Sequence, residues 1–420
     1  MYDGYAPTNA NPPRFSARYR IGSQTQSGIK PECNCGLLEG EEYDRSKTVS
    51  KVFACRSRPC DKGTAIRRSL TCDPSSNCAH WTARWTARWQ SPILQGMDPQ
   101  PLETDQSGHH HPRVLVAGEA LIDLVPSADH PGSYHAIPGG SPFNVAVGLS
   151  RLNIPTGFLG KVSTDPFGQQ VKTTLRGNGV GVGFVQDDSG PTRLALVTQK
   201  PGQEPQYAFY GHQTADANLE VGDLPVNLPA AIRAIHFGSL ALIAQPTGAT
   251  LTHLMRRESR HRIISLDPNV RASRIPDITA YTRQLEEWIT LSHIVKLSQA
   301  DLAVVFPAAH ADEVAAQWLA MGPQLIVTTQ GENGATAYVS SSSVHVPAPA
   351  IQLMDTVGAG DAFTSGLLAW LDDHAKLSID SLQQLDSGNL RLMLQFATQV
   401  AALTCGREGA DPPHRSELAI

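Results

Sequence analysis

The sequence lacks several features on which whole classes of protein depend. It has no run of about 18 consecutive apolar residues, the length that a membrane-spanning helix needs, so we expect no membrane partner. The first thirty residues also lack the apolar stretch of a secretory signal. Only 17% of the residues are charged, and the formal net charge is −5, so no basic surface for nucleic acid is indicated. These absences predict a cytoplasmic protein without a nucleic-acid partner.

Cysteine is scarce in most of the chain and is concentrated at its start. From Met97 onward there is only Cys405, which suits a reducing compartment. Charge divides at the same place: residues 1–96 hold 14 Lys and Arg against 8 Asp and Glu (+6), and the remainder holds 20 against 31 (−11). The 420 residues therefore combine two differently composed pieces, a short first part and a body long enough for a sizeable core.

The first piece has two patterns that could indicate binding. Its six cysteines are poorly spaced for zinc, with one, four and five residues between the members of successive pairs. The repeat WTARWTARWQ places three tryptophans on one face of any helix, as in a membrane-surface or nucleic-acid patch, but Ser, Pro and Gly surround it. The residues concerned are Cys33, Cys35, Cys55, Cys60, Cys72, Cys78, Trp81, Trp85 and Trp89. We therefore expect residues 1–112 to form an extension without stable structure.

A further interpretation is that the residues before Met97 are not native protein. Met97 opens MDPQPLETDQSGHHHPRVLVAGEALIDLV, a short polar lead into a strong strand, as in many enzymes. A transit peptide is the alternative, but the acidic residues between positions 39 and 44 weaken it. Intact-mass measurement of the natural protein distinguishes these interpretations.

From Arg113 the body alternates short apolar runs with segments of helical length. The apolar runs are RVLVAGEALIDLV, GFLGKV, AIHFGSLAL, RIISLDPN, HIVKLS and QLIVTTQG. Strands that are apolar on consecutive residues are buried on both faces, which predicts a mostly parallel sheet flanked by helices, with ligands at the carboxyl ends of the strands. Helices are expected from Ser141 as N-cap with Pro142 at the first position, from Asp361 through Trp370, and over about 390–403. The segment LALVTQKPGQEPQYAFYG predicts a β-hairpin that acts as a flap.

The stretch DTVGAGDAF, residues 355–363, suggests a site. Gly358, Ala359 and Gly360 would form a turn whose bare N–H groups and helix dipole can hold a phosphate. Asp361 follows in the first helical turn, where a carboxylate can accept a proton from an attacking alcohol. The structural alternative is a tight turn in which Asp361 only complements the helix dipole.

Two long motifs together resemble the ribokinase-like, or PfkB, family of carbohydrate kinases, and within it most closely the fructokinases. One is GGSPFNVAVGLSRLNIPTGFLGKVSTDPFG, residues 139–168, and the other spans residues 355–371. The resemblance covers about residues 113–410. It implies a three-layer α/β ribokinase-like fold over residues 113–420, with a small β-sheet lid from about 131–140 and 192–212.

The resemblance also implies roles for individual residues. Asp361 is similar to the catalytic base, and Gly358, Ala359 and Gly360 to the anion hole. The substrate side corresponds to Asp123, Gly139, Gly140, Asn144, Asn269 and Arg271, with Tyr207 and Phe209 as candidate lid aromatics. The nucleotide side corresponds to Lys296, Ser298, Thr329, Gly331 and Gly334. The structural alternatives are that Asp123 is an acid in a turn at the end of a strand, that Gly139 and Gly140 form a Gly-rich turn, and that the aromatics pack the lid on the sheet.

ATP as co-substrate and Mg²⁺ are implied by the family chemistry. Asp301 is expected to act on the magnesium ion indirectly, and Asp355 and Val357 resemble a monovalent-cation site, for K⁺, of some relatives. Ser298 and Asp301 replace the asparagine and glutamate that the family usually has in its metal region. Thr398 replaces an asparagine near adenosine, and His212 a basic lid residue.

Three classes of function were compared. The first is ATP-dependent phosphorylation of a small sugar at a primary hydroxyl, most simply fructose to fructose 6-phosphate, with 2-keto-3-deoxygluconate kinase and ribokinase as alternatives. The second is a non-catalytic, regulatory protein of the same fold. A nicotinamide-dependent oxidoreductase is disfavoured, because VLVAGEALID has only one glycine after the first strand. The lid sheet could pair with that of a second copy to form a homodimer.

Overall fold

The computed structural model describes residues 111–127, 130, 132–198 and 206–418. The predictions for the extension, including its cysteines, its tryptophans and the start at Met97, lie outside these residues, apart from residues 111 and 112. Within the described part, none of the helices is long and apolar enough to cross a membrane.

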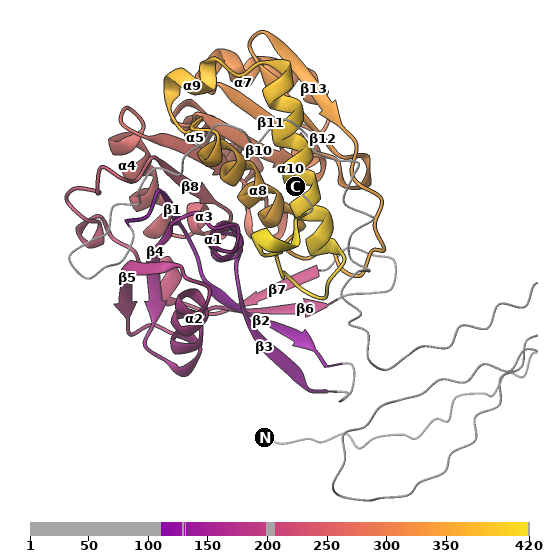
Figure 1. Cartoon of the computed structure of the whole chain (residues 1–420). Coiled ribbons are helices and arrows are strands. Elements are labelled where there is room, and N and C mark those ends of the chain that lie inside the picture. Colours follow the sequence, from indigo (N-terminus) through magenta and orange to yellow (C-terminus); the bar gives the residue numbers. More distant parts are fainter. Residues whose placement is uncertain (1–110, 128–129, 131, 199–205, 419–420) are drawn as a thin grey trace, which may run out of the picture. The chain divides into compact units, whose positions relative to one another are not determined.

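A nine-stranded sheet forms the centre of the body (Figure 1), in the order β13-β12-β11-β10-β9-β8-β1-β4-β5. All neighbours from β11 to β5 pair in parallel, and the two antiparallel pairings are β11 with β12 and β12 with β13. The strands are β1 (Val114–Ala117), β4 (Thr156–Ser163), β5 (Gly181–Asp188), β8 (Ala234–Gly238), β9 (Ile263–Asp267), β10 (Ile294–Ser298), β11 (Leu325–Thr329), β12 (Ala335–Val339) and β13 (Ser342–Val346). The predicted mostly parallel sheet is confirmed.

Helices cover both faces of this sheet and bury alternate residues of each strand. Val114 and Val116 of β1 pack in one core with α1, α2 and α8 to α10, whereas Leu115 and Ala117 pack in the other with α3 to α7. The helices are α1 (Ser141–Arg151), α2 (Pro166–Gly177), α3 (Leu240–Ile243), α4 (Thr247–Glu258), α5 (Ile278–Thr290), α6 (Gln299–Val305), α7 (Ala311–Met321), α8 (Ala359–Asp373), α9 (Ile379–Gln383) and α10 (Ser387–Cys405). The three-layer arrangement is thus confirmed.

A second, smaller sheet has the strand order β3-β2-β6-β7. Its strands are β2 (Leu121–Pro126), β3 (Tyr134–Gly139), β6 (Leu194–Thr198) and β7 (Gln206–Tyr210). The antiparallel pairing of β6 with β7 confirms the predicted hairpin. We call these four strands the lid; they project from the body in Figure 1.

Three local predictions were wrong or incomplete. The run from Arg113 to Val125 is two strands, because the chain turns after Ala117; a Cβ on Gly118 would lie 2.4 Å from Cγ of Pro142. The N-cap of α1 is Gly140 and not Ser141, which is the first helical residue. The edge strands β5 and β13, and β12 next to β13, were not predicted.

Candidate active site

The predicted sugar-side residues meet at the carboxyl edge of the central sheet, under the lid. A cavity of about 60 Å³ lies there. Among its lining residues are Glu119, Asp123, Gly140, Ser141, Asn144, Tyr207, Phe209, Ser239, Leu240, Arg271, Gly358 and Asp361. A larger cavity, of about 330 Å³, lies at the opposite edge, where β8 and β9 begin, and none of the predicted residues lines it.

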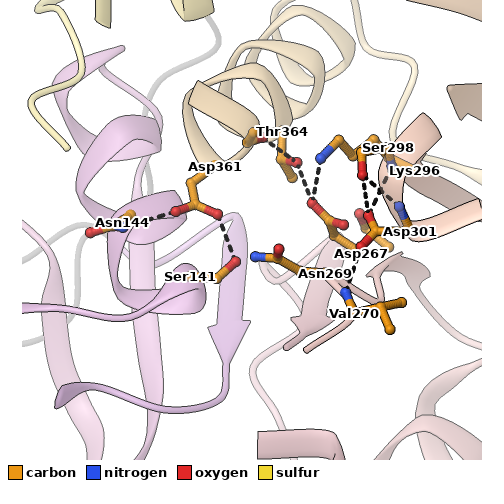
Figure 2. A network of polar contacts seen from close by, with 12 residues as sticks. Ser141, Asn144, Asp267, Asn269, Val270, Lys296, Ser298, Asp301, Asp361 and Thr364 are labelled. Carbon is orange, nitrogen blue, oxygen red and sulfur yellow. Dashed lines mark hydrogen bonds and ion pairs between the residues drawn. The ribbon is translucent and has the colours of Figure 1, made fainter. Parts of the chain in front are cut away.

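Asp361 lies in the first turn of α8, as predicted, and is only 7% exposed. Oδ1 accepts a hydrogen bond from the Ser141 hydroxyl at 2.6 Å, and Oδ2 accepts one from the Asn144 amide at 2.8 Å (Figure 2). Burial raises the pKa of Asp361, and these two hydrogen bonds oppose the rise. The local prediction of Ser141 as a cap fails for this reason: its hydroxyl is used by a carboxylate on another helix.

The glycine turn before Asp361 is tightly built. Gly358 is the N-cap of α8 with φ of 74°, and a Cβ there would lie 2.5 Å from Cβ of Ala410, so both backbone and space require glycine. The N–H of Ala359 donates to the carbonyl of Thr356 at 3.2 Å. The N–H groups of Gly358 and Gly360 make no hydrogen bond within the described residues. Of the predicted anion hole, the two glycines therefore offer the unused donors.

Asp123 projects from β2 into the same cavity as Asp361. Burial, reinforced by the charge of Asp361, raises the pKa of Asp123 to about 7, and the charge of Arg271 opposes the rise. Gly139 passes directly beside this carboxyl group, since a Cβ there would lie 2.2 Å from Oδ2. Gly139 of the first motif therefore allows the chain to pass close to Asp123.

Asn269 and Arg271 follow β9, and they join the body to the lid. Arg271 donates to Oδ1 of Asn269 at 2.6 Å, and its guanidinium carbon lies 6.0 Å from the ring centre of Tyr207 on β7. Tyr207 stacks on Phe209 with ring centres 6.2 Å apart. Both aromatics line the cavity, so the structure brings the predicted lid aromatics to the sugar-side residues.

Lys296 is buried next to the first turn of α8. Its ammonium group is 2.9 Å from Oδ2 of Asp267, which also accepts a hydrogen bond from the Thr364 hydroxyl at 3.3 Å. Burial lowers the pKa of Lys296, but the charge of Asp267 and their hydrogen bond outweigh burial, so the pKa is raised and the ammonium stays charged. A Cβ on Gly360 would lie 3.1 Å from this nitrogen. A fixed positive charge therefore lies next to the glycine turn.

Ser298 and Asp301 form the capping box that begins α6. Oδ2 of Asp301 accepts from the N–H and hydroxyl of Ser298, and Oδ1 accepts from the N–H of Val270 at 2.7 Å. Asp301 therefore fixes the loop that carries Asn269 and Arg271. Its role toward a metal ion stays a prediction.

Of the remaining predicted residues, Val357 lines the sugar cavity, whereas Thr329, Gly331, Gly334 and Asp355 are not among its lining residues. Thr329 ends β11, and Gly331 and Gly334 have positive φ in the turn to β12. Asp355 accepts hydrogen bonds from the N–H groups of Val357 at 3.1 Å and Gly409 at 2.9 Å, so it fastens the glycine turn to the loop after α10. The nucleotide and cation roles of these residues stay predictions.

Two acids of the site were not predicted. Glu119 is 1% exposed, and it accepts hydrogen bonds from the N–H groups of Leu240 at 3.3 Å and Ala241 at 2.9 Å. Burial raises its pKa to about 7. Asp267 lies in the apolar run RIISLDPN, but no role was predicted for it. Both residues could have been predicted from the sequence, since each is an acid at or just after the end of a run of apolar residues.

Comparisons with known proteins agree on the family. The model for "pfkB family carbohydrate kinase" matches residues 111–416. A fructokinase of Rhizobium leguminosarum bv. trifolii is 37% identical over 280 residues, which are 66% of this chain and 85% of that protein.

Two solved structures are similar to the body. The fructokinase of Xylella fastidiosa with bound ATP gives a TM-score of 0.65 at 27% identity, over 71% of this chain and 94% of that one. The fructokinase of Vibrio cholerae O395 with fructose, ADP and calcium ion gives 0.62 at 28% identity, over the same shares of the two chains. The protein therefore belongs to the pfkB family of carbohydrate kinases and is an ATP-dependent, fructokinase-like sugar kinase.

Proposed function

We propose that the protein transfers the γ-phosphoryl group of ATP to the primary hydroxyl of fructose and releases fructose 6-phosphate and ADP. The observation that carries this proposal is the position of Asp361, buried at the N-terminus of α8 and facing the same cavity as Asp123. The 37% identity to a fructokinase supports fructose as the sugar.

Asp361 is the general base in this proposal. Its carboxylate accepts the proton of the sugar hydroxyl while the hydroxyl oxygen bonds to the γ-phosphorus and the bond from that phosphorus to the bridging oxygen of ADP breaks. The N–H groups of Gly358 and Gly360 and the positive end of α8 stabilise the negative charge on the transferred group. Lys296, beneath Gly360, adds a charge that needs no reorganisation during the reaction.

Asp123 and Arg271 hold the sugar in place. A carboxylate has several acceptor positions, which suits neighbouring hydroxyl groups, and the planar guanidinium of Arg271 can bind phosphate oxygens in pairs. Asn144, Asn269 and the backbone at Gly139 and Gly140 complete the sugar side. Tyr207 and Phe209 close over the sugar and exclude water, which limits hydrolysis of ATP.

Magnesium would neutralise the phosphates of ATP. Within the described residues, no group of three or more His, Cys, Asp or Glu side chains could hold a metal ion. Both oxygens of Asp301 already accept hydrogen bonds, so its fit is to an ion held mainly by phosphate and water. We propose that Asp301 contacts such water, and that carbonyls near Asp355 and Val357 can hold K⁺.

A coupled assay of ATP consumption over four acceptors tests the function. We expect the highest kcat/KM with fructose, and lower values with 2-keto-3-deoxygluconate, ribose and adenosine. Preference for 2-keto-3-deoxygluconate or ribose would overturn the sugar assignment and leave the base assignment intact. No turnover on any acceptor would favour the regulatory, non-catalytic alternative.

A further inference from the structure

Ser141 contacts Asp361 but has no role in the proposed reaction. Its side chain is buried, and its hydroxyl donates to Oδ1 of Asp361 across 220 positions of sequence. A serine at the start of a helix usually caps the helix with its own side chain. In α1 no side chain caps the helix, so the hydroxyl is committed to the carboxylate of α8.

The two helices that hold Ser141 and Asp361 are fixed closely against each other. A Cβ on Gly148 of α1 would lie 2.5 Å from Oγ of Ser365 on α8, so glycine permits this approach. Gly140, directly before Ser141, has φ of 106°, and a Cβ there would lie 3.1 Å from the carbonyl oxygen of Glu119. The close packing around α1 and α8 therefore holds the Ser141 hydroxyl in a fixed position relative to the Asp361 carboxylate.

The two oxygens of Asp361 have different surroundings. Oδ1 is bonded to the buried hydroxyl of Ser141. Oδ2 is bonded to the amide of Asn144, which is only partly buried and belongs to the sugar-side residues. Both residues line the cavity, but the partly buried amide can exchange one acceptor for another when a sugar enters, whereas the Ser141 side chain is buried against Asp361.

We propose that Ser141 is a positioning residue: its hydroxyl holds Oδ1 of Asp361 so that Oδ2 is the oxygen that takes the proton from the sugar hydroxyl. In that step the sugar O–H bond breaks, the proton moves to Oδ2, and the freed electron pair forms the bond to the γ-phosphorus as ADP leaves. This inference rests on the proposed role of Asp361 as the base.

Loss of the Ser141 hydroxyl has two expected effects. The carboxylate can rotate, so fewer encounters have the reactive geometry, and kcat falls. The ionised form also loses a hydrogen bond, so the acid limb of the kcat profile moves to higher pH. The charged or titratable groups coupled to Asp361 are Asp123 on β2, Asp267 at the end of β9, Lys296 on β10 and Tyr207 on β7. Glu119 and Arg271 line the same cavity, and none of these six groups is changed by this substitution.

The test compares Ser141→Ala with Ser150→Ala in the full chain, with ATP and fructose as substrates. Ser150 lies on the same helix and donates at 2.6 Å to the carbonyl of Asn178, away from the cavity. We expect Ser141→Ala to lower kcat about tenfold and shift the acid limb upward, with KM for ATP within about twofold of its starting value. Ser150→Ala should leave both unchanged, and Ser141→Thr, which keeps a hydroxyl, should recover most of kcat.

A fall in kcat below about threefold with an unmoved acid limb would overturn the inference. Asp361→Asn, measured in parallel, separates the base assignment from the positioning role of Ser141. If Asp361→Asn stays active, the base assignment fails as well. If Asp361→Asn is inactive while Ser141→Ala behaves as wild type, only the positioning role fails. If Ser141→Ala does not fold, Ser141→Cys, a weaker donor of similar size, takes its place with the same expected direction.

Discussion

At the scale of single residues, buried carboxylates dominate the site. Asp123 is partly buried, and Asp361, Glu119 and Asp267 are buried; each has a different set of partners. Burial raises the pKa values of the first three, whereas Asp267 is paired with Lys296. The charges of these acids are therefore set by their neighbours and by what binds between them.

The pH dependence of sugar binding follows from Asp123. Because its pKa is about 7, it is mostly protonated at pH 6 and mostly ionised at pH 8. An ionised carboxylate accepts more hydrogen bonds from hydroxyls, so KM for fructose should fall about tenfold between pH 6 and pH 8. Initial-rate measurements across this range check it. Asp123→Asn should raise the KM for fructose and remove its dependence on pH. Asp380 is an exposed acid at the opposite edge of the sheet, so Asp380→Asn should retain the dependence. A KM of the wild type that rises with pH would contradict the assignment.

The buried pair of Asp267 and Lys296 makes a separate prediction about stability. Lys296→Met leaves an uncompensated carboxylate in the core, which should lower the free energy of unfolding by about 3–5 kcal/mol. Adding Asp267→Asn to the same chain should recover a large part of the loss, because no buried charge then remains unpaired. Urea unfolding measures both. A loss below about 1 kcal/mol for the single variant would show that the pair is not desolvated.

At the scale of elements, α8 is the helix on which the site depends. It carries Asp361 and Thr364 in its first two turns, and it packs between α1 and α10 in the order seen in Figure 1. Small residues make this packing possible: a Cβ on Gly366 would lie 2.9 Å from Cα of Ala397 on α10. The position of the base is therefore determined by contacts between helices.

Substitution of Gly366 should disturb this packing. Gly366→Ala introduces a methyl group against backbone atoms of α10 and should destabilise the protein by about 1–3 kcal/mol, despite the higher helix propensity of alanine. Gly177→Ala is the matched control, since no atom lies within 4 Å of a Cβ there, and it should be neutral or stabilising. Thermal or chemical unfolding compares the two. Equal stability of both variants would mean that α8 and α10 can separate without loss.

The elements also show what local sequence can and cannot predict. Strands buried on both faces, such as β8 to β11, were predicted because they are apolar on consecutive residues. The edge strand β5 was missed because none of its residues is fully buried, and its sequence GVGFVQDD mixes glycines and acids with the apolar residues. The glycine turn and Asp361 were predicted from one short motif, whereas the bond from Ser141 and the pair of Asp267 with Lys296 join distant segments, and no local pattern indicates such contacts.

At the scale of the whole molecule, we propose that the lid is a surface for association. β3 and β7 are the outer strands of the lid sheet, and unpaired strand edges can bind another strand. Large apolar side chains are also exposed on it, with Tyr134 at 50%, Ile137 at 45% and Tyr210 at 56%. These features support the proposal that two copies associate through their lids.

Light scattering after size-exclusion chromatography tests this association. We expect a dimer for the unmodified protein and a monomer for Ile137→Asp, because a charge on the outer strand opposes burial of that surface. Val226→Asp is the control, since Val226 is 86% exposed and lies outside the lid. A monomer for the unmodified protein, or a dimer that Ile137→Asp leaves intact, would contradict association through the lid.

The central claim is that Asp361 is the base of an ATP-dependent fructose kinase, and the most direct test is the rate of fructose-dependent ADP formation by wild type and by Asp361→Asn. Asparagine keeps the size of the side chain but cannot take the proton. We expect a fall in kcat of about 10²–10⁴-fold, with ATP binding and the melting temperature nearly unchanged. An Asp361→Asn variant that phosphorylates fructose at the rate of wild type would contradict it.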